Sequence, residues 1–291
     1  MGWRVVVAEK RCKLEYQTGY LICRGEQTQK VFLDEISTLI VENTAVAITG
    51  VLLAELVRRK INVVFCDENH NPLSQLNGLY NRFDCSGRIR EQLAWTDEIK
   101  AAVWAEIVKD KIRKQAQHLE DLGNAQAELL KSYIPQVEGG DVTNREGHAA
   151  KVYFNALFGM EFKRGDAEYK LNSLLNYGYA IVLSAFNREV VSCGYLTQCG
   201  IFHRNEYNYY NLSCDLMEPF RVLVDRRALA LVSGELDVAT KRELADLLNS
   251  RVTICGMSAT VSDAIATYAK HVFRALDDGD PTLLEFYECG I

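Results

Sequence analysis

The first 76 residues alternate between short apolar runs and turn-forming residues. Five of the runs are rich in β-branched and aromatic residues, as strands are, namely WRVVVA, GYLICR, QKVFLD, STLIVE and INVVFCD. Residues 45–60, between the fourth and fifth run, carry apolar side chains at helical spacing and end in three basic residues, which favour a helix C-terminus. The pattern predicts a small β-rich unit with one helix.

Helical spacing dominates the remainder of the chain. After a turn-rich connector at residues 77–87, residues 99–123 form one long amphipathic pattern that ends at Gly123, and residues 124–136 form a shorter one. Residues 171–186 are apolar on nearly every side, which is typical of a helix in the centre of a bundle. We therefore expect an α+β protein, with a small β-rich N-terminal domain at residues 1–80 followed by a larger all-α helical C-terminal domain at residues 81–291.

Composition is consistent with this organisation. The chain has 291 residues, of which 48% are hydrophobic and 25% are charged, as in a globular protein with room for two cores. Its nine cysteines are odd in number and never spaced C-x-x-C, which argues against a disulfide framework and against a zinc ribbon. The sequence shows neither a signal-peptide pattern nor an apolar run long enough to cross a bilayer. We expect a cytoplasmic protein that does not associate with membranes.

The net charge of −6 excludes a molecule that attracts nucleic acid over its whole surface, so any DNA contact has to be local. One helical pattern contains a run of basic residues: Lys109, Lys111, Arg113 and Lys114. Such runs usually form a solvated helix face. Arg221 differs because it lies beside a pair of acidic residues.

Asp215 and Glu218 form that acidic pair. In helical geometry two residues three positions apart lean over one patch, with their β-carbons about 5 to 6 Å apart. Two carboxylates held this close repel each other unless a cation lies between them, and Mg²⁺ and Mn²⁺ suit oxygen ligands. The same spacing also fits a helix capping box with Asp215 as the cap, although Pro219 weakens this alternative. The residues alone leave both interpretations open.

A third acidic residue, Glu146, begins another helical pattern. Thr143 and Glu146 resemble a capping box at the start of REGHAAKVYFNALFG, so a helix N-terminus is expected here. Glu146 shares a stripe with Tyr153 and Leu157, which directs its carboxylate inward. Because an unpaired buried charge is costly, this phase favours a cation or a proton next to Glu146 as much as it favours a simple cap. His148 lies off the stripe and is expected at the surface.

His203 lies in a loop rich in asparagine and tyrosine, twelve residues before Asp215. Neutral imidazole is a common metal ligand, although a lone loop histidine usually has no such role. The loop tyrosines could stack on unpaired bases, but packing over the bundle is their commoner role. Two further polar residues, Asn172 and Tyr177, fall within the apolar residues 171–186, where they either find backbone partners or support a site.

The sequence resembles the Cas1 family of CRISPR-associated endonucleases and integrases. The resemblance is carried by REGHAAKVYFNALFG, LNSLLNYGYAIVLSAF, CGIFH and, most of all, DLMEPFRVLVD, and MGWRVVV and INVVFCDENHNP also match. These motifs cover essentially the whole chain in the family's order and spacing. The last two segments look most like members from type II systems, which accompany Cas9.

The resemblance implies a metal site and its ligands. In the family, the positions equivalent to Glu146, His203 and Glu218 bind a divalent cation, Mg²⁺ or Mn²⁺, and are the catalytic residues. Asp215 is expected to support them, and Arg221 is either a phosphate clamp or an ion-pair partner of Glu218.

The resemblance also implies an activity and partners. Family members join the 3′-hydroxyl ends of a short captured double-stranded DNA, the prespacer, to the CRISPR repeat by attack on a phosphodiester. They form homodimers, here expected through the β-rich domain, and two homodimers flank a Cas2 dimer in a heterohexamer. Contacts with Cas9 and other type II adaptation proteins follow from the subtype.

Two alternative functions are kept beside this one. The first is a structure-selective nuclease of branched DNA in repair, which would yield cut strands and no joined ones. The second is a non-catalytic DNA-binding or scaffold subunit whose acidic residues are only helix caps. That subunit would have no affinity for a divalent metal.

Overall fold

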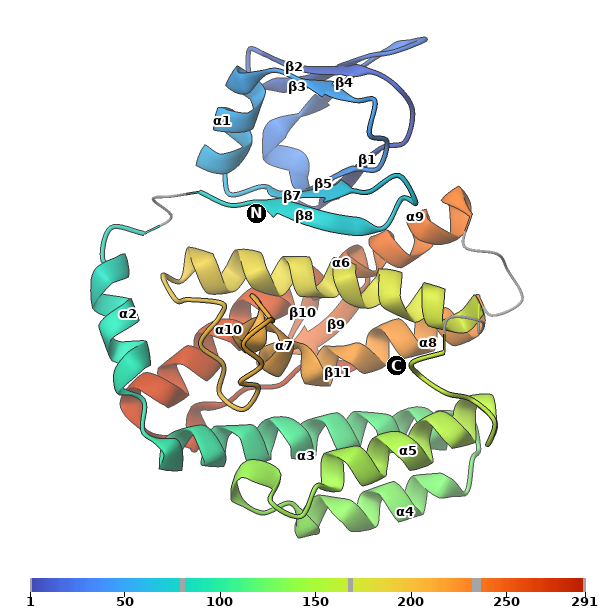
Figure 1. The fold of residues 1–291 in the computed structure, drawn as a ribbon, viewed down its shortest axis with the longest axis vertical. Helices are drawn as coiled ribbons and strands as arrows, with labels where there is room; N and C mark the ends of the chain where they lie inside the picture. Colours follow the sequence, from blue (N-terminus) through green and yellow to red (C-terminus); the bar gives the residue numbers. More distant parts are fainter. Residues whose placement is uncertain (1, 79–81, 167–169, 232–236, 290–291) are drawn as a thin grey trace.

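Two four-stranded sheets and one helix make up the N-terminal part of the structure (Figure 1). This computed structural model describes residues 2–78, 82–166, 170–231 and 237–289. The first sheet has the strand order β1-β5-β7-β8, with bounds Arg4–Ala8, Ile36–Val41, Asn62–Cys66 and Pro72–Leu76. The second has the order β4-β3-β2-β6, with bounds Thr28–Phe32, Tyr20–Arg24, Lys13–Gln17 and Ala47–Ile48. Helix α1 spans Gly50–Arg58.

The five strands predicted from apolar runs are confirmed as β1, β3, β4, β5 and β7. Strands β2 and β8 are not predicted, because KLEYQ and PLSQL contain no β-branched residue and form no apolar run. The helix predicted at residues 45–60 begins later than expected. Its first residues instead form β6, which pairs in parallel with β2.

Strand β5 shows how the N-terminal part meets the helices. It pairs in parallel with β1 and β7, and all six of its residues are buried. A parallel strand covered on both faces is expected to be apolar along its whole length, as ISTLIV largely is. Leu39 belongs to the N-terminal core, whereas Ile40 belongs to the core of the helical part. The first sheet therefore lies between the two cores.

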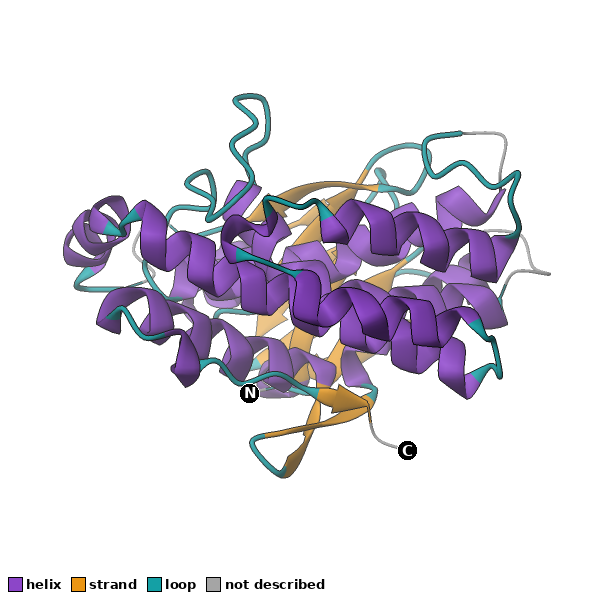
Figure 2. Cartoon of the chain, turned by 90° about the horizontal axis from the view of Figure 1, so that it is seen from below, coloured by secondary structure: helices purple, strands orange, loops and turns teal. Residues whose placement is uncertain are grey.

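The remainder of the chain is mostly helical (Figure 2). The α-helices are α2 (Cys85–Ala94), α3 (Asp97–Asp121), α4 (Gln126–Tyr133), α5 (Arg145–Phe158), α6 (Lys170–Ser192), α7 (Asn211–Met217), α8 (Arg221–Ala230), α9 (Val238–Asp246) and α10 (Val261–Asp278). Short 3₁₀ turns are η1 (Leu33–Glu35), η2 (Ile134–Gln136), η3 (Gly139–Asp141), η4 (Glu218–Phe220), η5 (Leu247–Asn249) and η6 (Pro281–Leu283).

Helix α6 is the central helix that the sequence predicts. It contacts α7, α8, α9 and α10, and it also lies against β7 and β8 (Figure 1). The long helix predicted at residues 99–123 is confirmed as α3, which ends just before Gly123, where φ is +67°. None of the helices in the described ranges has the length and hydrophobicity needed to span a bilayer.

A small sheet corrects the expectation that the C-terminal part is all-α. Strands β10 (Met257–Thr260), β9 (Arg251–Ile254) and β11 (Glu288–Cys289) form an antiparallel sheet in that order. Cys255 and Gly256 join β9 to β10, and both have positive φ, at 51° and 71°. Two consecutive residues of this kind form the tight turn that suits a hairpin. The strands are too short to show a two-residue period in the sequence, and the domain division at residue 80 stays a prediction.

Candidate catalytic site

The predicted ligands come from three segments that are far apart in the sequence. Glu146 lies in the first turn of α5, Glu218 begins η4, and His203 lies in the loop before α7. Helix α3 brings them together, because it packs against both α5 and η4. Figure 1 shows α3 and α5 side by side, with α7 and α8 in the neighbouring layer.

Glu146 lies at a helix N-terminus as expected, but the cap is a different residue. Asn144 precedes the helix with a φ of +51° and its side chain caps nothing, while Thr143 donates a hydrogen bond to the backbone of Gln136. The carboxylate of Asp141 instead accepts the backbone N–H groups of Arg145 and Glu146, at 2.8 and 2.9 Å. The Glu146 side chain is therefore not needed as a cap and can face inward.

Glu218 is buried between two cations. Its Oε2 atom lies 2.5 Å from the Nζ atom of Lys111, and its Oε1 atom accepts a 2.8 Å hydrogen bond from Nε of Arg221. The same Lys111 ammonium lies 2.6 Å from Oε1 of Glu146. Burial alone would raise the pKa of Glu218, but the charges of Arg221 and Lys111 outweigh burial and hold that pKa well below its usual value. The carboxylate is therefore ionised at neutral pH.

Asp215 holds the histidine loop in place. It lies inside α7 and is fully buried, so the capping-box alternative for Asp215 and Glu218 is wrong. Its Oδ2 atom accepts the backbone N–H groups of Ile201 and Phe202, at 2.6 and 3.0 Å, and its Oδ1 atom accepts that of His203 at 3.1 Å.

The His203 ring is oriented by the same carboxylate. Its Nδ1 atom lies 2.5 Å from Oδ1 of Asp215, an interaction that raises the pKa of His203 above its usual value although burial opposes it. This bond occupies Nδ1, so Nε2 is the ring nitrogen not bonded to Asp215. Trp104 packs edge-on against the ring and stacks on Phe202 at a centroid distance of 4.5 Å. A metal-binding histidine is typically held in this way by a carboxylate on its other nitrogen.

A cavity of about 440 Å³ opens beside the two glutamates. Its lining residues include charged, aromatic and amide side chains: Lys111, Gln115, Glu146, Phe154, Arg164, Gly165, Tyr179, Glu218, Arg221 and Asp225. Asp225 is buried and accepts a hydrogen bond from the hydroxyl of Tyr179, and burial raises the pKa of Asp225 to about 6. Both guanidinium groups, of Arg164 and Arg221, lie over the Tyr179 ring.

The two predicted supporting residues on α6 lie in different surroundings. The side-chain oxygen of Asn172 accepts a 3.0 Å hydrogen bond from Arg164, so Asn172 positions a residue that lines the cavity. Tyr177 does not line the cavity. It lies on the side of α6 that faces the N-terminal part, where the ammonium of Lys241 is 5.6 Å from its ring centre.

The donor set fits a divalent cation. Two carboxylates and one imidazole are hard or borderline ligands of the kind that Mg²⁺ and Mn²⁺ accept. The side-chain oxygen of Gln115, in the same cavity, is buried without a hydrogen-bond partner among the described residues, as an acceptor for a cation-bound water would be. In the described part of the chain, no three His, Cys, Asp or Glu side chains lie close enough together to hold a metal ion. Lys111 lies between two of them, so a divalent cation requires its ammonium group to move.

A family model described as CRISPR associated protein Cas1 matches residues 5–242. The chain belongs to the Cas1 family. A protein named CRISPR-associated endonuclease Cas1 from Neisseria meningitidis serogroup C is 33% identical over 87% of this chain and 86% of its own length. A second protein, named CRISPR-associated endonuclease Cas1 1, from Francisella tularensis subsp. novicida, is 27% identical over 78% of each chain.

Solved structures share the Cas1 fold. A Cas1 protein from Thermotoga maritima has a TM-score of 0.77 at 16% identity, over 95% of this chain and 98% of its own. A casposase bound to integration product has a TM-score of 0.70 at 18% identity, over 97% of this chain and 93% of its own. At these identities the likeness concerns the fold.

Lys111, which contacts both candidate glutamates, is not predicted from the sequence, and neither are Gln115, Arg164, Tyr179 and Asp225, which line the same cavity. The run from Lys109 to Lys114 suggests a solvated face, but Lys111 and Lys114 are both buried. A signal is present in the helical phase, because the residues three and four positions before Lys111, Val108 and Ile107, are also buried. The number of charged residues alone does not show which face of the helix each one occupies.

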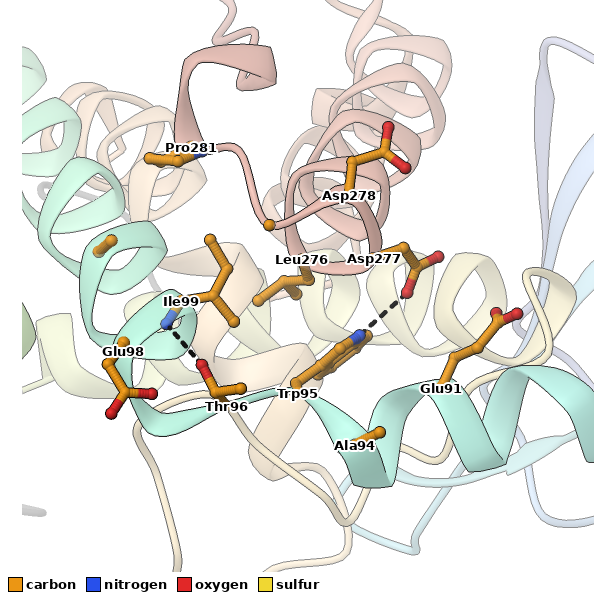
Figure 3. Close-up of a pocket in the computed structure, with 12 residues that line it drawn as sticks. Glu91, Ala94, Trp95, Thr96, Glu98, Ile99, Leu276, Asp277, Asp278 and Pro281 are labelled. Atoms are coloured by element: carbon orange, nitrogen blue, oxygen red, sulfur yellow. Dashed lines mark hydrogen bonds between the residues drawn. The ribbon is translucent and has the colours of Figure 1, made fainter.

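A larger cavity, of about 610 Å³, lies away from these residues (Figure 3). It is formed by the end of α2, the start of α3 and the end of α10, with Trp95, Ile99 and Leu276 in its wall. The indole N–H of Trp95 donates a 2.9 Å hydrogen bond to Asp277 there. None of the predicted site residues lines this cavity, so cavity size does not point to the candidate ligands.

Proposed function

We propose that this Cas1-family protein is a metal-dependent DNA endonuclease and integrase of CRISPR adaptation. The observation that carries the proposal is that Glu146 and Glu218, from two distant segments, line one cavity and share the Lys111 ammonium group, while His203 lies near enough to both carboxylates for them to raise its pKa. The two relatives are named CRISPR-associated endonucleases, and the casposase with the same fold is bound to an integration product. Together they support the same class of chemistry on DNA.

Glu146, His203 and Glu218 would hold Mg²⁺ or Mn²⁺. Such a cation, when bound, polarises phosphoryl oxygens and offsets the charge that develops on a leaving oxygen. Asp215 fixes the imidazole of His203 in one orientation and leaves Nε2 for the cation.

The remaining residues bind and orient the DNA phosphate. Arg221 and Arg164 line the cavity, and a guanidinium group forms paired hydrogen bonds with phosphate oxygens. In the joining reaction the incoming 3′-hydroxyl oxygen forms a new bond to phosphorus while the bond to the leaving 3′-oxygen breaks. The attacking hydroxyl loses its proton to solvent and the leaving oxygen gains one. No side chain acts as nucleophile, and water in place of the 3′-hydroxyl yields a cut strand.

The proposed partners follow from the same family. They are double-stranded DNA (prespacer and repeat), a second copy of the chain, a Cas2 dimer in a heterohexamer, and Cas9 with other type II adaptation proteins. One solved structure that shares the fold is a Cas6-RT-Cas1–Cas2 complex, with a TM-score of 0.73 at 19% identity.

A strand-transfer assay tests the proposal. Short duplex DNA is incubated with leader-repeat DNA, Cas2 and Mn²⁺ or Mg²⁺, and joined products are measured. We expect Glu146→Gln, His203→Ala and Glu218→Gln each to lower joining by about 100-fold or more. Glu206→Gln, in the same loop as His203 but exposed, is the control and should retain wild-type activity.

The product pattern separates the alternatives. Cut strands without joined strands would identify a nuclease of branched DNA. Full joining activity in Glu218→Gln and His203→Ala would show that the assigned residues are not catalytic. No product and no affinity for Mn²⁺ would identify a non-catalytic scaffold subunit.

A further inference from the structure

Lys111 is the residue whose position the proposed chemistry leaves unexplained. It projects from the middle of α3 and only 7% of its surface is exposed. Its ammonium nitrogen lies 2.6 Å from Glu146 and 2.5 Å from Glu218, two of the three proposed ligands. These partners are 35 and 107 residues away in sequence, so the contact forms only in the complete fold.

The ammonium group neutralises a pair of carboxylates that would otherwise repel each other. Its nitrogen lies within salt-bridge distance of both carboxylates, so its positive charge offsets their mutual repulsion. Removing one partner from a buried ion pair leaves the other charge uncompensated, which is strongly destabilising. Arg221 binds Glu218 at the other carboxylate oxygen, Oε1. Lys111 is therefore the cation that bridges the two glutamates in the described part of the chain.

We propose that Lys111 is the built-in counter-cation of the metal site: it holds Glu146 and Glu218 together in the absence of a divalent cation and competes with that cation for them. This inference rests on the proposed metal-dependent function. A divalent cation binds only after the ammonium group has left at least one carboxylate. Because Lys111 lines the 440 Å³ cavity, the displaced ammonium group has room to remain beside the site.

The competition has two measurable consequences of opposite sign. Without metal, the protein is more stable with Lys111 than without it, because the ammonium group stabilises both carboxylates. The affinity for a divalent cation is lower in wild type than in a variant that lacks Lys111, because part of the binding free energy is used to displace the ammonium group. A lysine that only supported the fold would not produce the second effect.

Calorimetric titration with Mn²⁺ tests the proposal on wild-type protein, Lys111→Met and Lys109→Met. We expect Lys111→Met to bind Mn²⁺ about tenfold more tightly than wild type, which corresponds to about 1.4 kcal/mol. Lys109 lies two residues away on the same helix and pairs with Glu106 at 2.8 Å instead. Lys109→Met therefore makes the same chemical change outside the site and should leave the affinity unchanged.

Thermal unfolding is measured for each protein in EDTA and in Mn²⁺. The change in melting temperature within one protein reports metal binding separately from how stable that variant is. Lys111→Met should melt below wild type in EDTA and should gain more from Mn²⁺ than wild type does. Lys111→Gln, which removes the charge but keeps an N–H donor, is measured alongside and should also bind Mn²⁺ more tightly.

The possible results separate the two proposals. Unchanged or weaker Mn²⁺ affinity in both Lys111 variants, with clear binding by wild type and loss of binding in Glu146→Gln, would overturn the role of Lys111 and leave the proposed function standing. Absence of Mn²⁺ binding in every protein, including wild type, would overturn the metal-dependent function itself.

Discussion

Replacing Asp215 by asparagine tests whether this residue supports the site or binds the metal. The carboxylate is fully buried and accepts four hydrogen bonds. Three come from the consecutive backbone N–H groups of Ile201, Phe202 and His203, and one comes from the His203 ring. Asparagine has nearly the same shape but only one oxygen, so it accepts bonds at one of the two positions and presents an NH₂ group to the donors at the other.

The expected loss follows from these contacts. Whichever way the asparagine amide is oriented, two hydrogen bonds to a charged acceptor are lost. Each of them contributes about 1.5 to 3 kcal/mol to the free energy of unfolding. We therefore expect the free energy of unfolding to fall by about 3 to 6 kcal/mol. The His203 ring also loses its fixed orientation, and loss of such a supporting contact typically weakens metal binding by about 10- to 100-fold.

Urea unfolding followed by circular dichroism gives the stability, and titration with Mn²⁺ gives the affinity. Asp97→Asn is the control, because that carboxylate is exposed and its ion pairs with Lys100 and Arg204 are worth at most about 1 kcal/mol. Wild-type stability and affinity in Asp215→Asn would refute the supporting role. Loss of Mn²⁺ binding as complete as in Glu218→Gln would show that Asp215 is itself a ligand.

Three further substitutions test other parts of the structure. Because burial raises the pKa of Asp225 to about 6 from 3.8, the folded state binds this proton more tightly than the unfolded chain does. Lowering the pH from 7 to 4 should therefore stabilise wild type relative to Asp225→Asn by about 2.5 kcal/mol, measured by urea unfolding at each pH. Trp104→Ala removes a fully buried ring that stacks on Phe202, and its midpoint in urea should reflect a loss of about 3 to 5 kcal/mol, with a smaller loss for Trp104→Phe. Gly178→Ala places a methyl group closer to the Val224 side chain than two carbon atoms can approach, at the contact between α6 and α8. This overpacking should destabilise the protein by about 1 to 3 kcal/mol and lower its melting temperature. Gly87→Ala, which meets nothing within 4 Å in α2, should instead be neutral or slightly stabilising.

The elements of this fold are predictable where one strong local pattern decides them. Residues 171–186 are apolar on nearly every side, and α6 is accordingly central. The helical phase places Glu146 at a helix start and on the inward face, and Ala149 and Tyr153 on the same stripe are fully buried. The identity of the cap is not predictable from the same pattern. Asp141 accepts the N–H groups of Arg145 and Glu146 from a turn in which Gly140, Asp141 and Asn144 all have positive φ, and the helical pattern does not predict such a turn.

The role of Lys111 depends on tertiary contacts, and this explains why local reasoning misses it. Lys109 and Lys111 have the same composition around them and differ in phase by two residues, or about 200° around a helix. One of them pairs with Glu106 on its own helix, and the other meets carboxylates delivered by α5 and η4. A helical phase can show that a lysine is buried, but it cannot show what it faces.

Spacing alone also makes Asp215 and Glu218 equivalent, and the fold makes them different. A carboxylate offers about four lone-pair positions. At Asp215 four N–H donors use them, and three of these donors are backbone groups that cannot move without unfolding the loop. At Glu218 the partners are the side-chain ends of Lys111 and Arg221, which, unlike backbone groups, can move without unfolding the chain. The acid that faces exchangeable cations is the better ligand, and the acid that faces fixed donors is the better support for His203.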